Sequence, residues 1–184
     1  MKAFSMFAAV VLVATTTHAA EVSVEGTHIC CGACVKGIEK ALGGAKGVSD
    51  VKIDKEKKTI SFKAEDRKGV RSGIVALARA GFAGQIKIDG KAIGRRKKKG
   101  KKAKARLVSN PTLRGPHNCC PGCAKAIATA LKGVDGVKNV QCEKRIIKIT
   151  GDDVNVGAAI AALRKAGFAA RYGTRKKPKK KKSE

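Results

Sequence analysis

Apolar and polar positions recur at regular spacing along the chain, and this pattern predicts a series of short elements. Val22 and Val24 alternate with polar residues, as in a strand, and the apolar positions of residues 35–42 recur at helical spacing. The later elements are marked by Val51 and Ile53, by Ile60 and Phe62, by Val70, Ile74 and Leu77, and by Ile86 and Ile88. The predicted order is strand, helix, strand, strand, helix, strand.

The whole pattern occurs twice. Residues 26–34 read GTHICCGAC, and residues 115–123 read GPHNCCPGC, 89 positions later. Further matches extend as far as Phe82 and Phe168, so the repeat fixes the unit of folding. Right-handed crossovers fold this order into a four-stranded antiparallel sheet with two helices on one face. We therefore expect an α+β protein made of two ferredoxin-like βαββαβ sandwiches joined by a basic linker.

Charge separates the two copies from the rest of the chain. The 184 residues carry a formal net charge of +27, and seventeen of these charges come from residues 91–114 and 174–184. Blocks of like charge repel themselves and are typical of linkers and tails. The predicted boundaries are a signal peptide at 1–19, a first domain at 20–90, a Lys/Arg-rich linker at 91–104, a second domain at 105–173 and a Lys-rich tail at 174–184.

The first residues predict export. Lys2 precedes a short apolar run, and the small residues Thr17 and Ala19 suit cleavage after Ala19. The run is too short to cross a bilayer, and no later segment approaches the required length. We therefore expect a periplasmic or extracellular protein without a membrane span.

Two Cys-x-x-Cys motifs carry the candidate chemistry, Cys31 with Cys34 and Cys120 with Cys123. Each motif lies where a loop meets a predicted helix, and a spacing of three places both sulfurs on one side of the helix. The start of a helix also favours thiolates. Paired thiolates suit a soft cation such as Cu(I) or Zn(II) better than Mg(II) or Ca(II). Each motif therefore predicts an open two-ligand metal site.

The motif and the element order together resemble the heavy-metal-associated domain of copper chaperones, metal-pumping ATPases and periplasmic mercury-binding proteins. The resemblance covers roughly residues 20–90 and 105–173. It implies that Cys31, Cys34, Cys120 and Cys123 are the metal ligands. The favoured ion is Cu(I), with Zn(II) or Hg(II) as alternatives. Where the family usually has Gly-Met-x before the first cysteine, this chain has His-Ile-Cys and His-Asn-Cys.

The histidine and the extra cysteine that precede each motif are open to two interpretations. As ligands, His28 and Cys30 in the first repeat, and His117 and Cys119 in the second, would give a three- or four-coordinate site, which suits Zn(II) or sequestration better than exchange. As structural residues, the histidine would cap the loop and one cysteine would simply be buried. Cys142 aligns with a core strand position, so we expect a buried apolar thiol there.

Two other functions stay open. The Cys-Pro-Gly-Cys sequence at residues 120–123 would suit a thiol–disulfide oxidoreductase in an exported protein. No proline lies between Gly122 and Arg175, however, where a thioredoxin-like fold would normally need one. Alternatively, the cysteines could be plain disulfides in a structural module without metal, although three per copy leave one unpaired.

The basic segments raise the question of partners. Lys/Arg runs bind polyanions, but the chain carries few aromatic residues and no nucleic-acid-binding motif, so no specific nucleic acid is expected. An anionic cell-envelope surface or an acidic partner protein would fit better. The 14-residue linker reaches at most about 50 Å, enough for the two metal sites to face each other and share an ion. We predict a non-enzymatic protein that binds a soft metal ion in each repeat, for sequestration or delivery.

Overall fold

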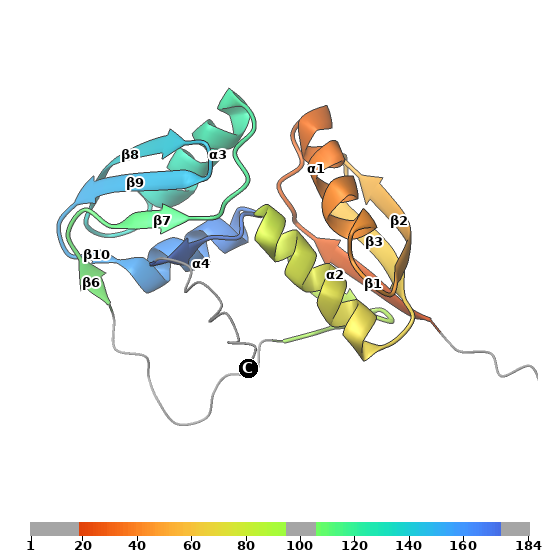
Figure 1. The fold of residues 1–184 in the computed structure, drawn as a ribbon. Coiled ribbons are helices and arrows are strands. Elements are labelled where there is room, and N and C mark those ends of the chain that lie inside the picture. The colour runs from red at the N-terminus through yellow and green to blue at the C-terminus, as the bar shows by residue number, and fades with distance from the viewer. Residues whose placement is uncertain (1–18, 95–105, 174–184) are drawn as a thin grey trace, which may run out of the picture.

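The computed structural model describes residues 19–94 and 106–173 (Figure 1). The predicted signal peptide except its last residue, residues 95–104 of the predicted linker and the whole predicted tail lie outside the described residues. The predicted domain boundaries are therefore not tested and stay predictions.

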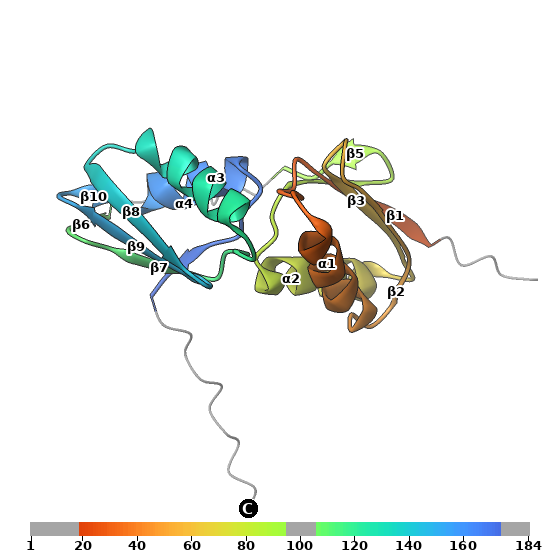
Figure 2. The ribbon, with the colours of Figure 1, turned by 90° about the horizontal axis from the view of Figure 1, so that it is seen from above.

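The first unit has the predicted order of elements. Its helices and strands are β1 (Ala20–Glu25), α1 (Gly32–Gly43), β2 (Val48–Asp54), β3 (Thr59–Ala64), α2 (Arg67–Ala80), β4 (Gln85–Ile88) and β5 (Lys91–Ala92). The sheet has the order β2-β3-β1-β4-β5 with antiparallel pairing throughout. Figure 2 shows both helices on one face of this sheet.

Strand β5 begins within the range that the charge pattern assigns to the linker. It pairs with β4 across a two-residue turn, Asp89 and Gly90, both of which have positive φ. Asp-Gly is the sequence that such tight hairpin turns favour, because both residues tolerate the left-handed conformation. The turn signal is therefore in the sequence, although the run of basic residues directly after it obscures the strand.

The second unit repeats the topology. Its elements are β6 (Leu107–Val108), β7 (Thr112–Arg114), α3 (Pro121–Lys132), β8 (Val137–Glu143), β9 (Ile146–Gly151), β10 (Val154–Asn155), α4 (Val156–Lys165) and β11 (Arg171–Tyr172). The main sheet has the order β11-β7-β9-β8, which corresponds to β4-β1-β3-β2 of the first unit. Strands β6 and β10 form a separate antiparallel pair. The predicted α+β class with two ferredoxin-like sandwiches is confirmed.

The positions that the apolar pattern marked form the core. In the first unit Val22, Ile38, Ile60 and Phe62 are almost completely buried. The fully buried large side chains of the second unit are Leu113, Ile127, Leu131, Ile147, Ile149, Leu163 and Phe168. Each such side chain contributes about 1.5–3 kcal/mol when it leaves water. Cys142 packs against this core as an apolar side chain would, but it is half-buried and not fully buried as expected.

The two units contact each other through the turns that follow α2 and α4. Gly81, at the end of α2, has a φ of 99° and accepts hydrogen bonds from the backbone N–H groups of His117 (3.3 Å) and Ala169 (2.9 Å). In the equivalent contact of the second repeat, the carbonyl of Gly167 accepts hydrogen bonds from the N–H groups of Ala83 (3.0 Å) and His28 (3.5 Å). The resulting pseudo-symmetric backbone contact brings the two cysteine loops face to face.

Within residues 19–94 and 106–173, no helix is both long and apolar enough to cross a membrane.

Candidate metal centre

Each Cys-x-x-Cys pair lies at the start of a helix, as predicted. Cys31 is the N-cap residue of α1 and Cys120 is the N-cap residue of α3, and neither side chain caps the helix by a hydrogen bond. The sulfurs of Cys31 and Cys34 lie 3.7 Å apart, and those of Cys120 and Cys123 lie 3.6 Å apart. Cys34 and Cys123 are fully buried beneath their more exposed partners.

The extra cysteine of each repeat reaches across to the other repeat. The Cys30 sulfur lies 3.4 Å from that of Cys120 and 3.5 Å from that of Cys123. The Cys119 sulfur lies 3.5 Å from that of Cys31 and 3.9 Å from that of Cys34. Six sulfurs from two helix starts therefore form one continuous cluster.

The spacing of the sulfurs is compatible with that of ligands around an ion. All seven cysteines of the chain are free thiols, and the contacts in the cluster lie between 3.4 and 3.9 Å. A disulfide would require about 2.05 Å. Thiolates about 2.3 Å from a tetrahedral ion lie roughly 3.8 Å from one another. The cluster could thus accept an ion with little movement of the side chains.

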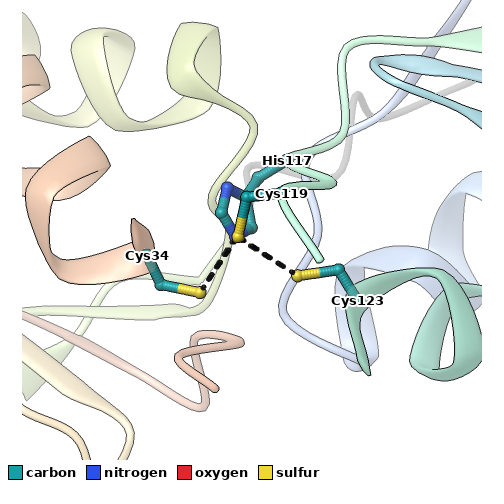
Figure 3. A group of neighbouring side chains, drawn as sticks. All are labelled: Cys34, His117, Cys119 and Cys123. Atoms are coloured by element: carbon teal, nitrogen blue, oxygen red, sulfur yellow. Dashed lines mark hydrogen bonds between the residues drawn. The ribbon is translucent and has the colours of Figure 1, made fainter. Parts of the chain in front are cut away.

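Two histidines border the sulfurs. The Nε2 atom of His117 lies 3.0 Å from the Cys34 sulfur and 3.5 Å from the sulfurs of Cys119 and Cys123 (Figure 3). One ligand atom from each of these four residues lies within 4.8 Å of the others, so they could hold a metal ion together.

His28 occupies the corresponding position in the first repeat. It forms a second candidate group with Cys30 and Cys123, again with ligand atoms within 4.8 Å of one another. Its Nε2 atom is buried, and among the described residues it has no hydrogen-bond partner. Leaving a buried polar atom unsatisfied costs about 1–3 kcal/mol. A bound ion is one way to satisfy this nitrogen.

The histidines also join the two repeats. The ring of His28 stacks on Phe168 with centroids 4.5 Å apart, and the ring of His117 stacks on Phe82 at 4.4 Å. Each histidine therefore lies on a phenylalanine of the other repeat. The same rings therefore hold the contact between the repeats and border the sulfurs.

The electrostatics differ among the cysteines of the cluster. Burial raises the pKa of Cys30, Cys119 and Cys123, whereas the N-cap cysteines have a lowered pKa. The backbone N–H of Cys34 lowers the pKa of Cys31 to about 6, and the N–H of Cys123 lowers the pKa of Cys120. Burial lowers the pKa of His117 to about 4 and also lowers that of His28. At neutral pH Cys31 therefore tends towards the thiolate, and both imidazoles are neutral. These are the forms that bind metal.

Comparison with known proteins identifies the first repeat. Residues 21–82 match the family model of the heavy-metal-associated domain. The first repeat is a heavy-metal-associated domain. The second repeat lies outside this match, but it has the same strand order and the same motif at the start of its first helix.

Two solved structures are similar to the chain. One is the water-soluble region of the P-type ATPase CopA from Bacillus subtilis, at 16% identity and a TM-score of 0.32, covering 83% of this chain and 89% of that one. The other is the solution structure of the N-terminal soluble domains of Bacillus subtilis CopA, at 17% identity and a TM-score of 0.29, covering 83% and 92%. No curated protein matches the chain.

The structure brings the predicted site residues together. The cysteine pairs of the heavy-metal-associated domain and of its repeat, the two extra cysteines and both histidines all lie in or beside one cluster. Sequence reasoning left open whether the two sites meet, and it did not find Gly81 or Gly167 as the contact that joins them. A Gly-Phe pair follows the second helix in each repeat, and this shared pair was the available signal.

Proposed function

We propose that this chain is an exported binding protein for soft metal ions, above all Cu(I), which it holds for sequestration or delivery. Cys31 with Cys34 and Cys120 with Cys123 would be the primary ligands. The observation that carries the proposal is the cluster of six free sulfurs, spaced at 3.4–3.9 Å, at the facing starts of α1 and α3. The heavy-metal-associated domain at residues 21–82 supports it.

The choice of Cu(I) follows from the ligands. Thiolate and neutral imidazole are soft or borderline donors, and the three candidate ligand groups of the described residues contain no carboxylate. Such a set suits Cu(I) and, less selectively, Zn(II) or Hg(II). We infer a binding role, because every residue in these groups can act as a soft or borderline ligand for an ion.

Export and partners belong to the same proposal. Export rests on the residue pattern of positions 1–19 and predicts a mature chain that begins at Ala20. Mass spectrometry of the secreted protein would measure that start. The two basic segments favour contact with an anionic cell-envelope surface or with an acidic partner protein that receives the ion.

The test is a Cu(I) titration of the reduced full chain against a Cu(I)-selective chelator. We expect the wild type to compete for the ion, and the variant with all four motif cysteines replaced by serine to lose this competition. The matched control is Cys142→Ser, because Cys142 is outside the cluster and should leave binding unchanged. A four-serine variant that binds as tightly as the wild type would refute the proposal.

The alternative functions are separated by two further measurements. Rapid reduction of insulin by the protein would favour a thiol–disulfide oxidoreductase. Thiol counting on freshly isolated protein would show permanent disulfides if the cysteines were structural cross-links.

A further inference from the structure

We propose that each metal site is completed by the other repeat. Cys119 supplies the third sulfur to the Cys31–Cys34 pair, and Cys30 supplies it to the Cys120–Cys123 pair. The proposal rests on the metal-binding function above and specifies its ligand set. It makes the two repeats one binding unit with two three-sulfur sites.

The distances define two closed triangles. In the first, the Cys31, Cys34 and Cys119 sulfurs lie 3.7, 3.5 and 3.9 Å apart. In the second, the Cys120, Cys123 and Cys30 sulfurs lie 3.6, 3.4 and 3.5 Å apart. Three thiolates about 2.3 Å from one ion would be roughly 3.8–4.0 Å apart in tetrahedral or trigonal geometry. Both triangles approach this spacing.

Each extra cysteine contacts the other repeat more than its own. The Cys30 sulfur contacts Cys34 of its own pair at 3.5 Å, but it contacts both sulfurs of the pair in the second repeat. Cys119 mirrors this, with Cys123 at 3.8 Å in its own repeat and both sulfurs of the first repeat within 3.9 Å. The same preference in both directions follows from the pseudo-symmetry of the interface.

The backbone at the start of the motif helix is alike in the two repeats. The N-cap residue Cys31 is extended, with a φ of −153° and a ψ of 172°, and Cys120 has nearly the same values. The Cys30 sulfur lies within 4.8 Å of both the Cys31 and the Cys120 sulfur, so the extra cysteine borders its own N-cap neighbour and that of the facing repeat.

The His117 imidazole lies between the two triangles. Its Nε2 atom contacts Cys34 and Cys119 of the first triangle and Cys123 of the second. A neutral nitrogen in this place can serve as a fourth ligand to either ion. With three or four ligands from two repeats, each ion is more enclosed than in a two-sulfur site, which favours retention over rapid exchange.

Variants with a single cysteine pair test the assignment in the full chain. In the Cys120→Ser, Cys123→Ser background only the first pair remains, with Cys30 in the same repeat and Cys119 in the other. Adding Cys119→Ser should weaken Cu(I) binding more than about tenfold, because even outer-shell partners contribute about 10–100-fold. Adding Cys30→Ser instead should change it less than threefold, an expectation that follows from the triangles.

The mirror background should give the opposite result. With Cys31 and Cys34 replaced by serine, Cys30→Ser should weaken binding and Cys119→Ser should not. Circular dichroism and thermal unfolding of each metal-free variant check that the chain still folds, with Cys142→Ser as the matched control. X-ray absorption on the wild type, loaded with two Cu(I) per chain, gives an independent count and should find three sulfurs per ion.

The outcomes are distinguishable. If the cysteine of the same repeat matters and the other does not, or if X-ray absorption finds two sulfurs per ion, completion across the repeats is wrong while the proposed function stands. If the wild type binds no more Cu(I) than the variant lacking all four motif cysteines, the proposed function itself fails, and this inference fails with it.

Discussion

The contact between the repeats should weaken when Gly81 is replaced by alanine. A Cβ atom at this position would lie 2.2 Å from the backbone nitrogen of His117 and 2.6 Å from the carbonyl oxygen of Gly115. Normal contact between such atoms is about 3.5 Å, so the second repeat would have to retreat by more than about 1 Å. The clash involves backbone atoms, which cannot rotate out of the way.

This displacement removes two hydrogen bonds. The Gly81 carbonyl accepts from His117 at 3.3 Å and from Ala169 at 2.9 Å, and both would exceed the usual hydrogen-bond distance after the shift. At about 1 kcal/mol each, their loss favours the separated repeats by about 2 kcal/mol. This corresponds to about a 30-fold larger population of separated repeats.

The control is Gly90→Ala. Alanine costs about 1–2 kcal/mol in the left-handed region, and both glycines lie there, with φ values of 99° and 74°. No atom outside the local backbone lies within 4 Å of a Cβ at Gly90, so this variant carries the strain without the clash. The difference between the two variants isolates the contact between the repeats.

Amide hydrogen exchange, followed by NMR on the reduced metal-free chain, measures the effect directly. The Ala169 N–H, whose acceptor is the Gly81 carbonyl, should exchange about 30-fold faster in Gly81→Ala than in Gly90→Ala. Equal protection of this amide in the two variants would show that the glycine contact does not hold the repeats together. The reasoning about the interface would then be refuted.

Three further predictions concern the pKa of a motif cysteine and the packing of the two cores. In the metal-free protein, iodoacetamide should alkylate Cys31 rapidly at pH 7 and more slowly as the pH falls through about 6. The reason is that the Cys34 N–H stabilises the Cys31 thiolate above that pH. An alkylation rate that still rises up to pH 9 would contradict this prediction. Ile127→Ala removes a fully buried side chain and should lower the free energy of unfolding, measured by urea titration, by about 2–5 kcal/mol. A loss below about 1 kcal/mol would argue against the described packing. Gly73→Ala places a Cβ atom 2.6 Å from the Phe62 ring. The clash should lower Tm, although alanine is the better helix former. A raised Tm would show that the Phe62 ring moves freely.

Much of the fold could be predicted from the sequence because its signals are local. The alternation of Val22 and Val24 and the helical spacing of Val70, Ile74 and Leu77 depend only on the periods of strand and helix, and the structure has these elements where the pattern placed them. Gly81 ends its helix in the left-handed conformation that glycine adopts readily, which is a local signal as well. The repeated order of elements then restricts the topology to the observed sandwich.

In the site, too, the local features could be predicted from the sequence and the long-range contacts could not. Sequence alone determined that each repeat has two sulfurs at the start of a helix, because Cys-x-x-Cys and its helix are contained in a few consecutive residues. Only the tertiary structure decided that Cys30 lies beside Cys120 and that His117 lies beside Cys34. These residues are more than 80 positions apart, and their meeting depends on how the backbones at Gly81 and Gly167 fit together. Such a fit arises from many small, shape-dependent contacts, and these leave no period along the chain.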